Sequence, residues 1–340
     1  MSATNKTLEI ATSPHIASGA SVDIIMRNVV YALLPVCAFA VYVFGLTALI
    51  TLTAATLSCV LTEHLLCRWR GATSTIGDWS VAITGILYGL TLPPGLPVWM
   101  VVLGGVIGVG VGKSLFGGLG YNAFNPALIG RAFLQAAFPV SMTTWYPSLG
   151  AERFSVLPSS TFTFPFAAPA YDSISGATPL AAMKFDGDMT ATTDLVMGLT
   201  SGSTGETSAV LILVGGIYLI ARKMMNWRIP AAIFATVFAL SGGLHLVDPG
   251  TYPSPVFMLF AGGLMLGAVF MATDMVASPM TSLGCVLYGV LIGALVVVIR
   301  LWGGMPEGVM YAILLANAVS PHIDNLVRPR VYGTAGRSAP

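Results

Sequence analysis

Residues 282–302 read SLGCVLYGVLIGALVVVIRLW, and this stretch decides the fold class. Its only charged residue is Arg300, near its end. About 20 consecutive apolar residues are enough for a helix to cross the hydrocarbon core of a bilayer. The stretch therefore predicts a transmembrane helix.

The composition of the whole chain supports the same interpretation. Of its 340 residues, 55% are hydrophobic and only 9% are charged, whereas soluble domains are about 25% charged. The mean hydropathy is +0.83. A net charge of +1 argues against a nucleic-acid partner. We expect an integral membrane protein surrounded by lipid.

Apolar segments of spanning length or slightly less recur along the chain. The predicted spans are 24–44, 47–66, 80–94, 97–115, 124–141, 207–225, 229–247, 255–273, 282–302 and 307–326. The sequence thus predicts an all-α membrane protein with about ten transmembrane helices in two five-helix halves. The third span runs into the prolines of residues 92–97, which end a helix. Such a break requires protein or water to satisfy the freed carbonyl groups.

Basic residues predict the orientation, because cytoplasmic loops are enriched in lysine and arginine. The alternate loops carry only Arg153, Lys184 and Arg300. Eleven bases fall on the other side: Lys6, Arg27, Arg68, Arg70, Lys113, Arg222, Lys223, Arg228, Arg328, Arg330 and Arg337. Both termini are therefore expected in the cytoplasm. The expected division is a first membrane half (1–141), a periplasmic loop with little helix (142–206), and a second half with a cytoplasmic tail (207–340).

Glycines recur at intervals of four inside the predicted spans. Small residues at this spacing let helix backbones approach closely, so tight bundle packing is expected at Gly104, Gly108, Gly112, Gly263, Gly267, Gly289 and Gly293. The run GVGVGKS at 108–114 resembles a phosphate-binding loop, but its first glycine is replaced by Ile107. The four cysteines form no CxxC motif, which argues against a metal site built by this chain alone.

The loop 142–206 contains the peptide DSISGATPL at 172–180. Thr178 precedes Pro179, and a residue before proline is disfavoured in the helical conformation. Gly176 and Ala177 place little bulk beside the threonine hydroxyl. We therefore expect Thr178 to be extended and exposed. On composition alone, an ordinary turn of serine, glycine, threonine and proline is the better explanation of the peptide.

The segment Asp172-Ser173-Ile174-Ser175-Gly176-Ala177-Thr178 resembles the D-x-x-S-G-A-T signature of a family of flavin-carrying membrane subunits. That family comprises NqrB of the sodium-pumping quinone reductase and RnfD of the Rnf complex. The resemblance covers nearly the whole chain and is greater to RnfD, because the chain lacks the long amino-terminal extension of NqrB. It implies FMN joined to Thr178 by a phosphoester and attached by a dedicated flavin transferase. Asp172, Ser175, Gly176 and Ala177 complete the flavinylation motif, and Asp172 would suit a metal or recognition role in the transferase reaction.

The resemblance also implies a function. The chain would be a subunit of a redox-driven ion translocase in the bacterial inner membrane, inactive without the other membrane and peripheral subunits of an Rnf complex. Electrons would pass between ferredoxin and NAD, and sodium ions or protons would be moved. Two alternatives remain: a flavin-free transporter or channel with urea-transporter-like architecture, and a structural anchor for redox partners.

A second candidate site is the sequence GYNAFNP at 120–126. Asn122 and Asn125 lie three residues apart, and amides suit the polar edge of a flavin ring. The alternative is that Asn125 caps a helix that begins at Pro126. The family resemblance implies non-covalent riboflavin here, with Thr273 and Asp274 completing the pocket.

The charged or titratable residues within predicted spans include Arg131, Glu63 and His64. An unpaired charge there costs several kcal/mol, so Arg131 should face protein or water. It would contact a flavin or form an ion pair with an acid. Glu63 and His64 are expected at the membrane interface, near the end of the second span.

Overall fold

The computed structural model describes residues 21–71, 75–165, 167, 176–206 and 208–328, and within these ranges every regular element is helical. The helices are α1 (Val22–Phe44), α2 (Leu46–Trp69), η1 (Ile76–Asp78), α3 (Ser80–Leu90), α4 (Val98–Val109), η2 (Gly110–Ser114), α5 (Pro126–Ala137), α6 (Pro139–Met142), α7 (Pro179–Ala181), η3 (Ala182–Asp186), α8 (Thr192–Met197), α9 (Ala209–Ala221), α10 (Arg228–Val247), α11 (Pro255–Phe260), α12 (Leu264–Leu266), η4 (Gly267–Met271), α13 (Ser282–Trp302) and α14 (Val309–Leu326). The elements η2, η3 and η4 are π-helical.

Among the residues that the structure describes, four helices are long and apolar enough to cross a membrane: α1, α2, α10 and α13. Helix α13 covers 282–302, as predicted. Each of the ten predicted spans contains a helix, but several helices are short, and the predicted span 255–273 is broken between α11 and α12. The all-helical architecture with several membrane-length helices is therefore confirmed, whereas the number of ten spans stays a prediction.

Glycines allow the closest helix contacts, as predicted. A Cβ on Gly289 of α13 would lie 2.7 Å from the Ala232 Cβ of α10. A Cβ on Gly293 would lie 2.8 Å from the Thr236 Cβ. In α4, a Cβ on Gly108 would lie 2.8 Å from the Pro126 carbonyl oxygen of α5. The backbones of these helices are therefore closer than a larger residue permits.

Groups in the segment 142–206 donate hydrogen bonds to the carbonyl oxygens at the end of α3. The chain leaves α3 ahead of the prolines, and the N–H groups of Thr91 and Leu92 donate to carbonyl groups in the last turn of the helix. The Thr204 hydroxyl donates to the carbonyl oxygens of Gly89 and Leu92, each at 2.7 Å. The Gly205 N–H donates to the Leu90 carbonyl at 2.6 Å. Protein groups thus meet the carbonyls that the break exposes, as expected.

The break between α11 and α12 occurs at two glycines, and the first, Gly262, has a φ of +67°. Charged side chains satisfy both helix ends. The Arg300 guanidinium donates to the carbonyl oxygens of Met258 (2.5 Å) and Ala261 (2.8 Å) at the end of α11. The Glu307 carboxylate accepts the Gly263 N–H at 3.1 Å, before α12. Arg300 and Glu307 therefore stabilise the two helix ends at this break.

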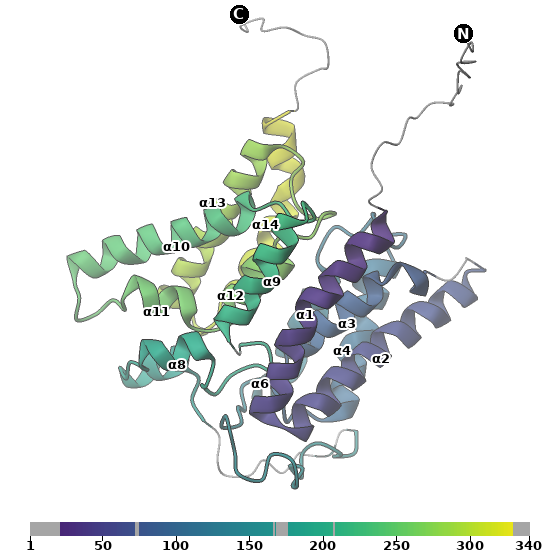
Figure 1. The fold of residues 1–340 in the computed structure, drawn as a ribbon, viewed down its shortest axis with the longest axis horizontal. Helices are drawn as coiled ribbons and strands as arrows, with labels where there is room; N and C mark the ends of the chain where they lie inside the picture. Colours follow the sequence, from purple (N-terminus) through teal and green to yellow (C-terminus); the bar gives the residue numbers. More distant parts are fainter. Residues whose placement is uncertain (1–20, 72–74, 166, 168–175, 207, 329–340) are drawn as a thin grey trace, which may run out of the picture.

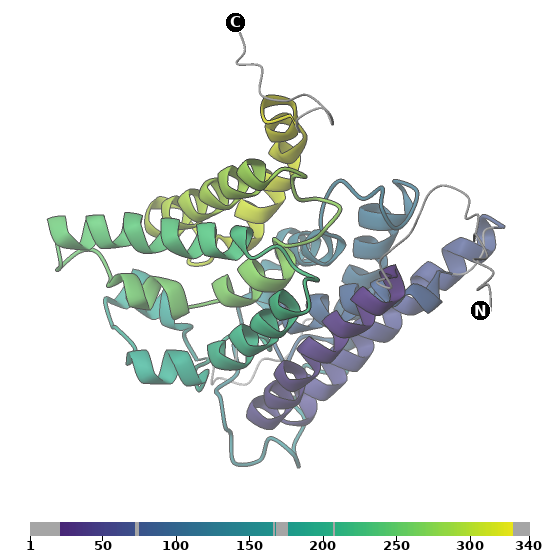
Figure 2. The same ribbon diagram turned by 45° about the horizontal axis from the view of Figure 1, so that its top comes forward.

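Helices α1 to α4 gather on one side of the molecule and α9 to α14 on the other (Figure 1). The start of α1 and the end of α14 both lie at the top of this view, whereas α8, in the segment 142–206, lies low in the view. The view turned by 45° shows the same grouping (Figure 2). The described residues of the segment 142–206 are mostly turns and irregular chain, but they include the short helical elements α7, η3 and α8.

Candidate functional site

Thr178 has the extended backbone that Pro179 predicts, with φ −69° and ψ 152°. Its hydroxyl accepts the Ala181 N–H at 3.2 Å and caps α7. The expectation that Thr178 is exposed is wrong: the residue is only 2% exposed. Ala177 and Gly176 of the motif lie beside it, whereas Asp172 and Ser175 lie outside the described residues.

Thr178 lines a cavity of about 550 Å³, which we call the Thr178 cavity. Ligand pockets have volumes of about 300–1,000 Å³ and predominantly apolar walls. The walls here include Trp145, Phe185 and Tyr311, and two charged side chains, Arg131 and Glu307. Thr178 therefore lies at the wall of a cavity that also contains aromatic side chains. The other walls come from α5 and from residues 304–311, which the local motif does not encode.

Arg131 and Glu307 form an ion pair at the wall of this cavity. The Arg131 Nη2 lies 2.7 Å from the Glu307 Oε2, and the two side chains are 10% and 15% exposed. This confirms the ion-pair alternative for Arg131. The Arg131 Nε is buried and has no partner among the described residues. The guanidinium therefore has one donor without a protein partner among the described residues, at a nitrogen that is itself buried.

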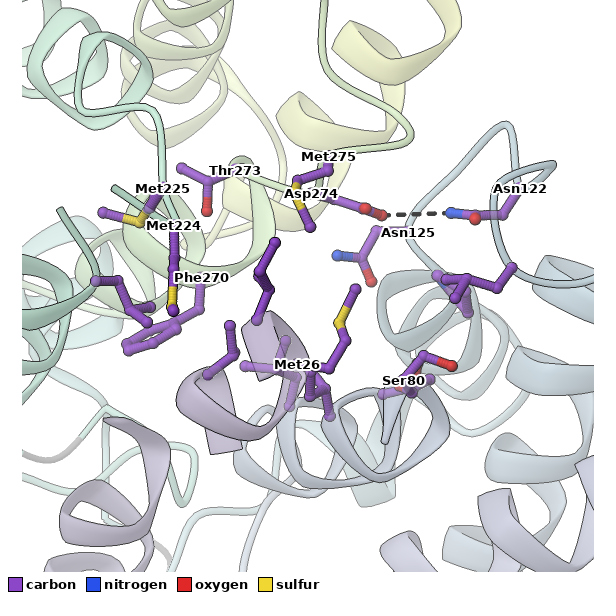
Figure 3. Close-up of a pocket in the computed structure, with 18 of the residues that line it drawn as sticks. Met26, Ser80, Asn122, Asn125, Met224, Met225, Phe270, Thr273, Asp274 and Met275 are labelled. Carbon is purple, nitrogen blue, oxygen red and sulfur yellow. Dashed lines mark hydrogen bonds between the residues drawn. The ribbon is translucent and has the colours of Figure 1, made fainter. Parts of the chain in front are cut away.

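A second cavity contains the other four predicted site residues, and we call it the Asn cavity. Asn122, Asn125, Thr273 and Asp274 all line it, together with Lys113. The Asn122 Nδ2 donates to the Asp274 Oδ2 at 3.3 Å, across two segments distant in sequence (Figure 3). The segment 120–126 and the residues Thr273 and Asp274 thus meet in space. The cavity volume is about 110 Å³, below the range of about 300–1,000 Å³ that ligand pockets occupy.

The two asparagine amides have structural partners. The Asn125 Oδ1 accepts the Ala127 N–H at 3.0 Å, which confirms that Asn125 caps α5 ahead of Pro126. Its Nδ2 donates to the Met271 carbonyl at 3.2 Å. Asp274 accepts the Val276 N–H at 3.1 Å, and burial raises the pKa of its carboxyl group. These contacts fix the polar wall of the cavity.

Sequence reasoning missed a buried ion pair beside the Asn cavity. The Lys113 Nζ lies 2.7 Å from the Glu63 Oε2 and 2.7 Å from the Ser80 Oγ. Glu63 also accepts a hydrogen bond from the Thr75 hydroxyl. Glu63 is only 3% exposed, so its expected interfacial position is wrong, whereas His64 is exposed. Two opposite charges inside apolar segments are a signal of such a pair, because intramembrane charges tend to pair.

Comparisons with known proteins identify relatives along the full chain. The D component of the proton-translocating ferredoxin:NAD(+) oxidoreductase complex of Clostridium ljungdahlii is 40% identical over 338 residues, covering 96% of each chain. The D component of the Na(+)-translocating complex of Acetobacterium woodii is 40% identical over 332 residues, covering 96% of this chain and 95% of the relative. The D component of the ion-translocating oxidoreductase complex of Stutzerimonas stutzeri is 41% identical over 338 residues, covering 94% of each chain.

A family profile described as the NQR2, RnfD, RnfE family matches residues 9–333. The match covers nearly the whole chain, including both candidate cavities. Relatives of about 40% identity align with this chain over nearly their full length. The family profile covers all of the residues that the structure describes. The chain therefore belongs to the NQR2, RnfD, RnfE family.

Proposed function

We propose that this chain is the D component of an ion-translocating ferredoxin:NAD(+) oxidoreductase complex and that it carries FMN as a phosphoester on Thr178. The observation that carries the proposal is the position of Thr178, which ends a D-x-x-S-G-A-T motif and lines an aromatic cavity of about 550 Å³. The names of the full-length relatives support the complex. The chain is a subunit of a redox enzyme and acts with the other subunits of that complex.

The residues around Thr178 suit a linked flavin. Bound FMN supplies reversible electron transfer, and the protein contributes placement and electrostatics. The Thr178 oxygen provides the attachment point, and Trp145, Phe185 and Tyr311 offer aromatic surface for an apolar ring system. The unpaired donor of Arg131 suits an anionic group. Size, wall chemistry and charge all agree with FMN in this cavity.

Riboflavin in the Asn cavity is the second part of the proposal. Asn122, Asn125 and Asp274 supply donors and acceptors for a ring edge. The cavity is small, but flexible methionine side chains border it and readily change shape to admit a ligand. These are Met26, Met224, Met225 and Met275.

The charge of the Asn cavity favours a flavin without phosphate. Lys113 is the cation among the described residues that line the cavity, and Glu63 neutralises it. A phosphate group would therefore find no unpaired positive charge on these walls. Riboflavin suits the site better than FMN.

The transported ion is sodium or a proton. The relatives from Clostridium ljungdahlii and Acetobacterium woodii are equally identical to this chain, yet one is named for protons and the other for Na⁺. Similarity over the whole chain therefore does not select the ion. We place both termini in the cytoplasm of the bacterial inner membrane and 142–206 in the periplasm, between two five-helix halves. The eleven bases on one side support this, as does the common end of the molecule that α1 and α14 share.

The flavin assignment is tested on denatured protein. The chain from the purified complex is separated on a denaturing gel and viewed under ultraviolet light. We expect flavin fluorescence in the wild type, none in Thr178→Ala, and some in Thr178→Ser, because serine retains a hydroxyl group. Fluorescence in Thr178→Ala would place the attachment elsewhere. A dark wild-type chain would instead favour a flavin-free transporter or a structural anchor.

A further inference from the structure

Four charged side chains meet where the break between α11 and α12 adjoins the Thr178 cavity. They are Arg131, Glu206, Arg300 and Glu307. Glu307 is paired with Arg131 at 2.7 Å and accepts the Gly263 N–H. The carboxyl groups of Glu206 and Glu307 are hydrogen-bonded to one another. Glu206 also accepts the Ser203 hydroxyl at 2.8 Å. The cluster thus joins the long loop, α5, the end of α13 and the loop before α14.

The two carboxyl groups share one proton. An ionised carboxylate only accepts hydrogen bonds, so a bond between two carboxyl groups requires one of them to be protonated. Burial and the neighbouring Glu307 carboxylate raise the pKa of Glu206 well above its usual range. Glu206 therefore holds the proton, and Glu307 is the ionised partner of Arg131. The pair carries one negative charge against two guanidinium groups, which leaves one net positive charge.

This excess charge lies at Arg131 rather than at Arg300. Arg300 is 1% exposed, and its two terminal nitrogens donate to the Met258 and Ala261 carbonyls at the end of α11. The negative end of a helix dipole partly offsets a cation in that position. The Nε of both arginines is buried without a partner among the described residues. Arg131 is paired with the Glu307 carboxylate and lines the Thr178 cavity, whereas Arg300 is not among the lining residues. The net positive charge at the wall of the Thr178 cavity therefore favours a bound anion.

We propose that Arg131 stabilises negative charge inside the Thr178 cavity and thereby raises the reduction potential of the flavin attached there. The inference rests on the proposed function. One electron from a partner carrier adds one negative charge to the cavity, and no bond forms or breaks. A guanidinium fixed beside a poorly solvated site attracts that charge strongly, because the local dielectric is low. Arg131 is thus a positioning and tuning residue, and Glu307 moderates its charge.

The experiment is a redox titration of the purified complex, followed by flavin absorbance. The signal of interest is the component that the Thr178→Ala complex lacks. Arg131→Gln removes the cation and should lower the equilibrium constant for one-electron reduction at least tenfold, which is a shift of about 59 mV. Arg131→Lys keeps the charge and should stay within threefold of the wild type. Glu206→Gln replaces a neutral carboxyl by a neutral amide and should also stay within threefold.

A shift of the reduction potential in the opposite direction distinguishes an electrostatic effect from structural damage. Adding Glu307→Gln to the Glu206→Gln variant removes the remaining carboxylate, so the potential should rise above that of Glu206→Gln alone. This comparison decides the question even if Arg131→Gln fails to assemble. Unchanged potentials, or shifts in the same direction for every variant, would overturn the inference while the gel fluorescence of Thr178 still stands. A wild-type chain without covalent flavin would overturn the proposed function and this inference together.

Discussion

Lys113 and Glu63 show how single buried charges shape the structure beside the Asn cavity. Both are 3% exposed, and each is the principal partner of the other. Removing one member of a buried pair leaves an uncompensated charge and costs about 3–5 kcal/mol. We therefore expect Lys113→Met to destabilise the chain strongly. Denaturation by sodium dodecyl sulfate, followed by tryptophan fluorescence, measures the loss.

The matched control removes both charges. In Lys113→Met with Glu63→Gln, no ionised group of this pair stays buried, and the amide introduced at position 63 can still accept from the Thr75 hydroxyl. Since replacing a buried pair by neutral groups is often nearly neutral, the double variant should regain most of the stability. Equal losses in the single and double variants would show that packing around Lys113, not charge pairing, is responsible.

Residue-level predictions succeeded where the cause is local. The cap at Asn125 follows from the adjacent Pro126, and the extended backbone of Thr178 follows from Pro179. Predictions that depended on contacts with distant parts of the chain failed. The partner of Glu63 is 50 residues away, and the cavity beside Thr178 has walls from α5 and from residues 304–311. Spacing within a motif carries no information about these contacts.

At the scale of helices, the α10–α13 contact depends on glycine. A Cβ on Gly289 would lie 2.7 Å from the Ala232 Cβ and 2.8 Å from the Ile229 carbonyl oxygen. Overpacking of this kind costs about 1–3 kcal/mol, so we expect Gly289→Ala to weaken resistance to the same detergent denaturation. Gly243, inside α10, is the control, because a Cβ there would meet nothing within 4 Å. Gly243→Ala should be neutral or stabilising, by about 0.5–1 kcal/mol. Equal destabilisation by both would contradict the packing argument.

Helix positions were largely predictable, and helix breaks only partly so. Predicted spans such as 24–44 and 229–247 match α1 and α10 to within two residues, because long apolar runs leave little choice. The stop after α3 followed from its prolines. The break at Gly262 was missed because the surrounding residues are apolar, although the Gly262-Gly263 pair is a recognised turn signal. The groups that stabilise this break, Arg300 and Glu307, come from elsewhere in the chain and had no local signature.

On the scale of the whole molecule, α5 connects the two cavities. Its cap, Asn125, lines the Asn cavity, and Arg131, further along, lines the Thr178 cavity. The Asn cavity is built around the start of α1 and the end of α9, and the Thr178 cavity around α6 and the loop before α14. Two redox groups at these places would divide a transmembrane distance into shorter steps. One helix would then position both groups.

The last prediction concerns the group in the Asn cavity and must separate binding from helix capping. Replacing Asn125 by alanine would remove the cap of α5 and confuse the two roles. Asn125→Ser keeps an N-cap of similar strength but loses the amide donor that faces the cavity. Combined with Asn122→Ala, it should leave the fold and the fluorescence of the Thr178-linked flavin intact. Flavin extracted by acid from the purified complex should nevertheless fall by about one riboflavin per complex, because a ring edge would lose its polar partners. Unchanged extractable riboflavin alongside normal Thr178 fluorescence would show that these asparagines only cap α5 and bind Asp274 and Met271.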